Sequence, residues 1–435
     1  MALGGGTFTV QNKELPGAYV NFVSAASANP ALSDRGVVTM PLELDWGVEG
    51  EVFEVSNADF RKNSMEIFGY DYTHDKMKGL RDLFLNAQTL YAYRLNTGGD
   101  KAANSFATAR YPGERGNALK IVIQENADDQ TKYDVQTLLD TTVVDEQTVS
   151  AASELTDNKY VTWSSGMELA ANPGAALGGG SNGDVEGGAH LAYLDKIEAY
   201  TYNVMGVTVT DDVTKGMYAS FCKRMRDEMG IKFQLVVYNY GADHYGVINV
   251  KNKILDEGRN EASLVYWVAG KEAACPVNRS VQNAVYDGEF NVDVGLTQTQ
   301  LKQAIKAGEF TFHKVGSDIR VLEDINSMVT VSDTCSDIFK DNQTVRVIDQ
   351  IGNDIAVLFN TKYLGVVPND NAGRVSLWSD IVKHHEQMQE IRAIENFSDS
   401  DVTIEQGETK KSVVVSDAVT VVNAMGKLYM TVTVA

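Results

Sequence analysis

The C-terminal stretch of residues 411–435, KSVVVSDAVTVVNAMGKLYMTVTVA, constrains what this chain can form more than any other part of it. Two runs rich in β-branched residues flank residues 423–427, which include a glycine. Apolar side chains alternate along both runs, and a period of two is typical of β-strands with one buried face. The sequence therefore predicts a terminal β-hairpin, and its apolar face consists of Val413, Val415, Val419, Val421, Leu428, Met430, Val432 and Val434.

The outer edge of the second predicted strand carries little that would prevent it from pairing with another strand. Only Lys427 supplies a charge there, whereas exposed edges are normally protected by charges, prolines or bulges. Two arrangements remain open. Either the strand lies inside its own domain's sheet and is paired on both sides, or its edge is offered to another copy of the chain.

The N-terminal residues 1–23 have the composition of an exchange arm. Three glycines at positions 4–6 form a tether, and the segments TFTV and ELPGAYVNFVS follow with strand-forming residues but little apolar surface. Adding such an arm to an exposed edge is β-augmentation. Repeated head to tail between identical subunits, it builds a ring or a helix. The arm residues predicted to link subunits are Phe8, Val10, Tyr19, Val20 and Phe22.

Charge and composition exclude several classes of function. The net charge of −21 argues against nucleic acid as a partner, because phosphate binding needs a basic face. Cys222, Cys275 and Cys335 are far apart and match no metal-binding spacing, which indicates free thiols in a reducing compartment. Neither a signal sequence nor an apolar run long enough for a bilayer is present, so we expect cytosolic synthesis and no direct membrane insertion.

Hydrophobic periodicity predicts a multidomain chain of class α/β plus β. Residues 24–97 form the first part of an α/β domain, and residues 98–178 contain short strands typical of an inserted β-sandwich. Helices and apolar strands alternate again over residues 179–318, which predicts a largely parallel sheet covered on both faces. Residues 319–435 form a C-terminal α+β domain that ends in the hairpin.

The glycine-rich stretch of residues 166–188 matches a nucleotide-binding pattern in its residue spacing but not in its sequence context. Gly178, Gly180 and Gly183 satisfy G-x-G-x-x-G, but that fingerprint must follow a strand and open a helix. Here Pro173 precedes it and an acidic segment follows. We interpret the stretch as a loop or linker.

The histidine pair His384-His385 lies in a predicted helix over residues 376–394. Adjacent helical residues point about 100° apart and do not share a face, which argues against a metal site and favours a solvated polar face. Alternatively, Lys383, His384 and Arg392 form a small basic face for an acidic partner. No P-loop, H-E-x-x-H or G-x-S-x-G motif is present, so we predict no catalytic, cofactor or metal site.

Five segments of the chain matter for its family relationship: LPGAYVNF at 15–22, RGVVTMPLELDWG at 35–47, ARYPGERGNALKI at 109–121, IRVLEDINSM at 319–328 and NAMGKLYMTVTV at 423–434. Together they resemble the contractile tail sheath proteins of bacteriophages and phage-tail-like bacteriocins, in the branch found in Gram-positive bacteria. YPGERGN and AMGKLYM are the most specific pieces, and all five occur in the expected order along nearly the whole chain.

This resemblance implies a structural subunit and no enzymatic activity or cofactor. Its fold would comprise an inserted β-sandwich, a central subtilisin-like α/β domain and a C-terminal domain facing an inner tube, which the helix over residues 376–394 would contact. Subunits would form a helical sheath of stacked rings around the tail tube protein, together with baseplate and tail terminator proteins. Assembled in the bacterial cytoplasm, the sheath would contract in the released particle and drive the tube through an envelope.

Two other classes of function remain open on the sequence alone. One is a different self-assembling protein, such as a surface-array or secretion-sheath component. The other is an α/β enzyme with a regulatory β domain.

Overall fold

The computed structural model describes residues 32–434, which form two compact units. The larger unit comprises Asp34–Gln350 together with the C-terminal residues from Val421 onward, and the smaller one is built from Ile351–Thr420. Each unit has its own hydrophobic core. Among the residues described, no helix combines the length and the apolar character needed to cross a membrane.

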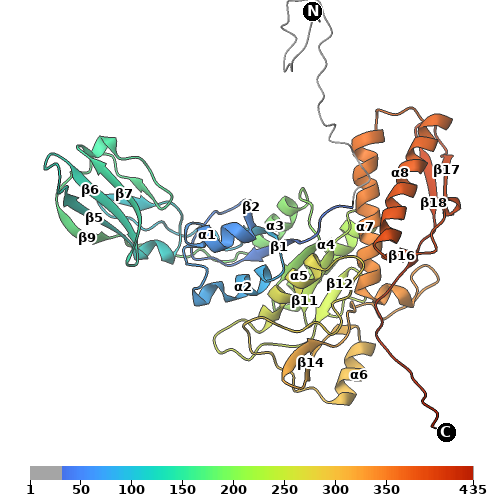
Figure 1. The fold of residues 1–435 in the computed structure, drawn as a ribbon. Helices are drawn as coiled ribbons and strands as arrows, with labels where there is room; N and C mark the ends of the chain where they lie inside the picture. Colours follow the sequence, from blue (N-terminus) through green and yellow to red (C-terminus); the bar gives the residue numbers. More distant parts are fainter. Residues whose placement is uncertain (1–31, 435) are drawn as a thin grey trace, which may run out of the picture. The chain divides into compact units, whose positions relative to one another are not determined.

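A seven-stranded sheet organises the larger unit (Figure 1). Its strand order is β13-β12-β11-β10-β1-β3-β2, and every neighbouring pair is parallel except β2 with β3. The apolar runs detected in the sequence supply its central strands, which are almost entirely buried. The strands are β1 (Val37–Leu42), β2 (Val52–Ser56), β3 (Thr89–Arg94), β10 (Val204–Val207), β11 (Gln234–Tyr238), β12 (Val247–Val250) and β13 (Glu309–Phe310).

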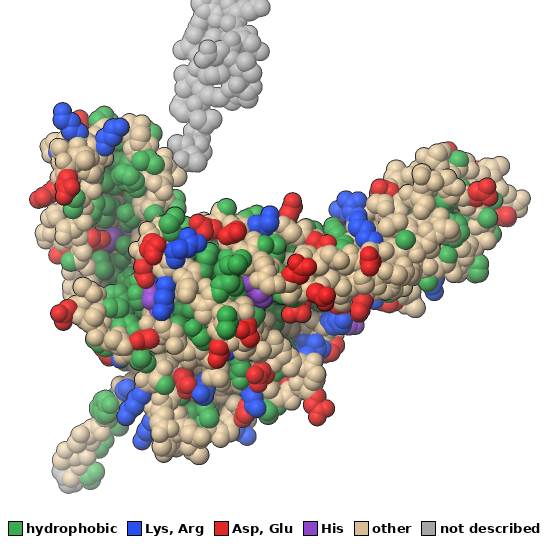
Figure 2. All heavy atoms as spheres, turned by 180° about the vertical axis from the view of Figure 1, so that it is seen from behind, with side chains coloured by type: hydrophobic (Ala, Val, Ile, Leu, Met, Phe, Trp, Pro, Cys, Tyr) green, Lys and Arg blue, Asp and Glu red, His purple; other side chains and the backbone are tan. Residues whose placement is uncertain are grey.

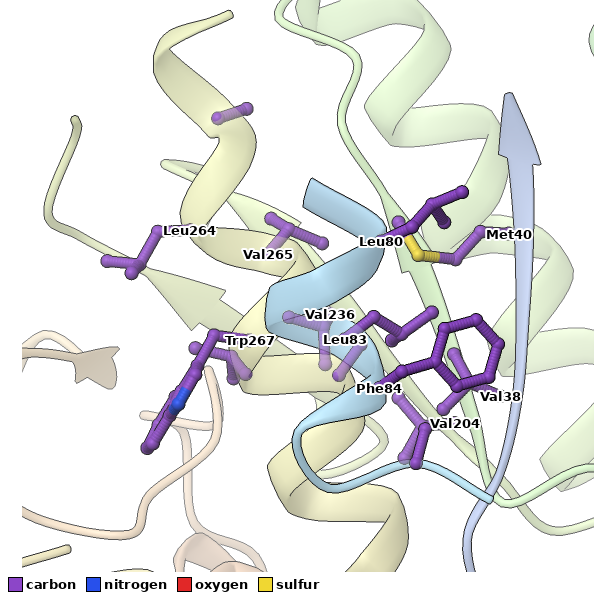
Figure 3. Packing of buried hydrophobic residues seen from close by; sticks show 14 of the residues in the cluster. Val38, Met40, Leu80, Leu83, Phe84, Val204, Val236, Leu264, Val265 and Trp267 are labelled. Carbon is purple, nitrogen blue, oxygen red and sulfur yellow. The ribbon is translucent and has the colours of Figure 1, made fainter. Parts of the chain in front are cut away.

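Helices cover both faces of this sheet, as the alternating pattern predicts. On one face, Trp267 and Val265 of α5 and Leu83 of α2 pack against Val38 and Val236 of the strands (Figure 3). A second core lies on the other face, under α3 and α4. The helices of this unit are α1 (Asn57–Phe68), α2 (Lys78–Phe84), α3 (Ala189–Ile197), α4 (Asp212–Asp227), α5 (Leu264–Ala274) and α6 (Gln298–Lys306).

Residues between β3 and α3 form the β-sandwich. Four antiparallel strands follow the order β7-β6-β5-β9, and β4 pairs with β8 beside them. Trp46, which follows β1, is buried in the sandwich core and so joins the two domains. The strands are β4 (Ala107–Ala109), β5 (Leu119–Glu125), β6 (Tyr133–Leu139), β7 (Thr142–Val149), β8 (Val161–Trp163) and β9 (Asn172–Ala176). A separate hairpin of β14 (Phe312–Val315) and β15 (Asp318–Val321) completes the larger unit.

Part of the glycine-rich stretch is ordered into strand and bridges, so the prediction of a loop or linker is wrong for residues 172–176, whereas most of the stretch is irregular as predicted. Residues 172–176 form β9, and Asp184 forms a β-bridge with Thr97. A Cβ atom on Gly183 would overlap the Thr97 carbonyl oxygen, and one on Gly113 would overlap the carbonyl oxygen of Asp45. Glycine is therefore needed at these positions because two backbone segments approach each other closely. A high glycine content alone does not show whether a segment is flexible or closely packed.

The smaller unit places two helices beside a short β-ladder (Figure 1). Helix α7 (Asn342–Leu358) contributes its residues after Gln350 to this unit and continues into a π-helical turn, Phe359–Tyr363. Helix α8 (Asn371–Glu390) starts at the N-cap Asp370, whose carboxylate accepts a hydrogen bond from the Gly373 amide. The antiparallel strands β17 (Val402–Gln406) and β18 (Val413–Asp417) then pack on α8. Two short strands, β16 (Ile394–Glu395) and β19 (Thr420–Val421), form a further two-stranded sheet.

Candidate assembly interfaces

The predicted terminal hairpin does not form, because its first half pairs with another strand and its second half is not a strand. The first half forms β18, but its partner is β17, in which Ile404 lies opposite Val415. Residues 422–434 carry no strand. Period-two alternation indicates that a segment can be a strand, but it does not identify the partner.

The second half is an exposed apolar tail. Its predicted inward-facing residues are all at least 69% exposed, and Figure 2 shows hydrophobic side chains along it with no other part of the chain over them from that side. Soluble monomers rarely expose a continuous apolar segment of this kind, and such surfaces mark interaction sites. The exposed residues are Met425, Leu428, Tyr429, Met430, Val432 and Val434.

Strands β17 and β18 form the complementary feature in the smaller unit. Their five-residue ladder is a sheet of its own, so within residues 32–434 each strand has one edge without a strand partner. Val414 and Val415 of β18 are 56% and 40% exposed. An open edge with exposed β-branched residues is a template for a further strand.

Of the other residues predicted to link subunits, three lie within the described part of the chain and five lie outside it. Val413 is half-buried at the start of β18 and packs against the core of the smaller unit. Val419 and Val421 are half-buried around β19. The N-terminal arm residues Phe8, Val10, Tyr19, Val20 and Phe22 lie outside the described residues.

The predicted basic face on α8 is wrong for His384. Both His384 and His385 are buried, at 1% and 0% exposure, so the alternative of a solvated polar face is also wrong. His384 Nε2 lies 3.0 Å from Asp354 Oδ2 of α7, and His385 Nε2 lies 2.8 Å from Asp417 Oδ2 of β18. The two Nε2 atoms therefore face partners on different elements, α7 and β18, while the two Nδ1 atoms lie 3.3 Å apart. Lys383 and Arg392 are exposed.

The pair of His244 and Asp227 does not form a catalytic arrangement. His244 and Asp227 are paired at 3.2 Å, and burial lowers the pKa of this histidine despite its carboxylate neighbour. However, its other ring nitrogen accepts a hydrogen bond from the Gly246 amide and faces no nucleophile. In the same part of the chain, no group of His, Cys, Asp and Glu has the arrangement of a metal site.

Sequence reasoning missed a buried polar cluster around the first half of α7. Arg346 bonds Asp324 and Glu272, and Arg226 forms a bidentate pair with Asp349; all five side chains are 8% exposed or less. A detectable signal was present, because Arg346 and Asp349 interrupt the apolar run VRVIDQI. Charged residues in such a run face the core only when paired.

Comparison with known proteins accounts for nearly the whole described chain. Family models match residues 35–95 (tail sheath protein Gp18 domain III, N-terminal region), 96–182 (phage tail sheath protein β-sandwich domain), 183–327 (central domain) and 334–435 (C-terminal domain). A protein of the phage-like element PBSX of Bacillus subtilis is 31% identical over 99% of this chain and 100% of its own length. The chain belongs to the phage tail sheath protein family.

Solved structures agree with this assignment. The sheath tail protein of Desulfitobacterium hafniense is 35% identical and superimposes with a TM-score of 0.81, covering 93% of this chain and 96% of that one. The contracted helical sheath of the anti-feeding prophage shares the fold, with a TM-score of 0.59 at 12% identity over 97% and 99% of the two chains. The chain is therefore a contractile tail sheath subunit, a structural protein rather than an enzyme, in the tail of a phage or phage-like particle.

Proposed function

We propose that this sheath subunit polymerises by exchanging strands with identical neighbours. The C-terminal tail of one copy adds to the open β17–β18 ladder of another, and residues 1–23 supply a second strand. The supporting observation is the tail itself, which exposes alternating apolar side chains and has no strand partner within residues 32–434. Because tail and ladder are different surfaces, the contact is heterologous and propagates from subunit to subunit.

Burial of the tail's apolar side chains, more than its backbone hydrogen bonds, decides whether the added strand is stable. Backbone hydrogen bonds contribute about 0.5–1.5 kcal/mol each, whereas ordering the tail costs about 1–2 kcal/mol per residue. Hydrogen bonds alone therefore do not offset the loss of backbone entropy. Burying a side chain such as Leu428, Met430 or Val432 contributes about 1.5–3 kcal/mol, which makes the added strand stable and fixes its register.

The finer architecture follows from these links. Stacked rings surround an inner tube protein, and their contraction drives the tube through a bacterial envelope. A baseplate lies at one end of the sheath and a tail terminator protein at the other. Energy is stored in the packing of the extended sheath at assembly, so no nucleotide or cofactor is required. Assembly takes place in the bacterial cytoplasm, before release of the phage or bacteriocin particle. We assign the central domain the subtilisin-like fold of the family, which as a fold carries no hydrolase function.

The tube-facing surface comprises α8 and the residues just after it, because Arg392 follows the end of the helix at Glu390, and it needs one revision. Lys383 and Arg392 are exposed and keep their proposed role in contacting an acidic tube surface. His384 is removed from this set because its ring is buried against Asp354.

Electron microscopy of purified protein tests strand exchange. The full chain is expected to form rings or hollow tubes, and chains that lack residues 1–23 or residues 425–435 are expected to remain unassembled. Circular dichroism of the truncated chains controls for folding, since the tail contributes no strand to its own subunit. If both truncated chains form the same tubes as the full chain, strand exchange does not link the subunits.

A further inference from the structure

The tail is exposed along most of its length, but its root is held by the side chain of Gln343 in α7. Gln343 Nε2 donates to the carbonyl oxygen of Val422 at 3.1 Å, and its Oε1 accepts from the Ala424 amide at 2.9 Å. These are the two bonds that one residue of a parallel strand makes to the residues on either side of its opposite residue. The side chain of Gln343 thus replaces a neighbouring strand at this point.

Thr344 holds the residue between these two bonds. Its hydroxyl lies 3.1 Å from Asn423 Nδ2 and 3.2 Å from Asn423 Oδ1, so it can accept from the first and donate to the second. Gln343 and Thr344 are each only 2% exposed, whereas Met425, the next tail residue, is fully exposed. Asn423 and Ala424 are thus the tail residues that these two side chains hold, and further along the tail Lys427 Nζ lies 4.0 Å from Glu323 Oε1.

Other side chains of α7 fix the helix to the parallel sheet. Asn342, Arg346 and Asp349 recur at helical spacing and point toward the core of the larger unit. Asn342 Oδ1 accepts from Gln234 Nε2 of β11 at 3.0 Å, and Arg226 of α4 binds Asp349 with two bonds of 2.6 and 2.7 Å.

Arg346 adds a second buried ionic contact between α7 and the core. It bonds Glu272 of α5 and lies 2.7 Å from Asp324 Oδ2. Burial raises the pKa of the Glu272 carboxyl well above its usual range. Burial also opposes ionisation of Asp324, but the Arg346 guanidinium outweighs it and keeps the pKa of Asp324 below its usual value. Separating such buried pairs is costly, so the start of α7 does not move easily against the sheet.

We propose that Gln343 and Thr344 form an anchor that fixes the point at which the tail leaves its subunit. This inference rests on the proposed function: when the sheath contracts, the pull of the neighbouring subunit passes from the tail through the anchor and α7 into the parallel sheet. The anchor also limits the geometry of the assembly. Residues 425–434 span at most about 36 Å when fully extended, so the neighbour's open edge lies within that distance of Ala424.

Hydrogen exchange in the unassembled full chain tests the anchor independently of the sheath. With Gln343→Ala we expect the Ala424 amide to exchange about tenfold faster, which corresponds to the loss of one hydrogen bond. Thr344→Val keeps the shape of the side chain and removes only the hydroxyl, and it should give a smaller increase. Gln303→Ala, at an exposed position of α6, is the matched control. Unchanged exchange at Ala424 in Gln343→Ala overturns the anchor.

Contraction of assembled sheaths tests the role in carrying load. Wild-type and Gln303→Ala sheaths triggered with urea are expected to contract as continuous tubes in electron micrographs, whereas Gln343→Ala sheaths separate into short stacks. If Gln343→Ala sheaths stay continuous, the load-bearing role is wrong. If the wild-type chain forms no sheath at all, the proposed function fails, while the exchange measurement still decides whether the anchor exists.

Discussion

Removing Arg226 should destabilise the larger unit strongly, because its partner would be left as a buried unpaired charge. Arg226 is fully buried and makes two bonds to Asp349 and one to the Phe233 carbonyl oxygen. Breaking a buried pair from one side costs about 3–5 kcal/mol, since the remaining ion has lost its solvent and its partner. We therefore expect Arg226→Met to lower the free energy of unfolding by about that amount.

A matched control lies two residues earlier on the same helix. Arg224 pairs with Glu198 at 2.7 Å, but the two side chains are 43% and 34% exposed. Surface pairs contribute about 0–1 kcal/mol, so Arg224→Met should change stability little. In the double variant Arg226→Met with Asp349→Leu, the unpaired charge is gone, and at least about half of the loss should be recovered.

Urea unfolding followed by circular dichroism measures these differences, with the slope of the transition checked for constancy. A loss below about 1 kcal/mol for Arg226→Met, or a double variant no more stable than the single one, would refute the reasoning. Either result would mean that water or a rearranged side chain replaces the pair. The anchoring of α7 to the sheet would then rest on apolar packing alone.

Two further predictions concern the domain joint and the pH dependence of stability. Gly183→Ala should destabilise the chain by about 1–3 kcal/mol because its methyl group would overlap the Thr97 carbonyl oxygen, whereas Gly187→Ala, with open space around it, should be nearly neutral in the same urea assay. Burial raises the pKa of Asp82 from 3.8 to about 6. Between about pH 4 and 6 the folded chain then keeps a proton that the unfolded chain releases, so the free energy of unfolding should fall as pH rises, by up to about 3 kcal/mol. Asp82→Asn should lack this fall, and equal pH profiles for the two proteins would contradict the assignment.

The elements that could be predicted from the sequence are those specified by local patterns. Apolar runs such as residues 234–238, flanked by amphipathic helices, require a parallel sheet covered on both faces, and this is the fold observed. Short alternating strands between residues 107 and 176 likewise predicted the sandwich. In both cases the period of the pattern determines the element and its buried face.

The features that could not be predicted depend on partners distant in the sequence. Alternation in residues 428–434 indicates a strand but does not reveal that no partner lies within the described chain. His384 resembles a surface residue until Asp354 of α7 is placed against it. Gln343 gives no signal at all, because its role depends on the backbone of residues 422 and 424.

The most direct test of strand exchange compares the two faces of the tail. Met430 lies on the predicted apolar face and Thr431 on the opposite one, and the structure leaves this part of the tail exposed, so neither substitution disturbs packing within the subunit. Met430→Asp would place a charge against the neighbour's core and should abolish tubes in electron micrographs, whereas Thr431→Asp should still form them. If both variants form tubes, or if neither does, the tail does not dock as a strand with one buried face.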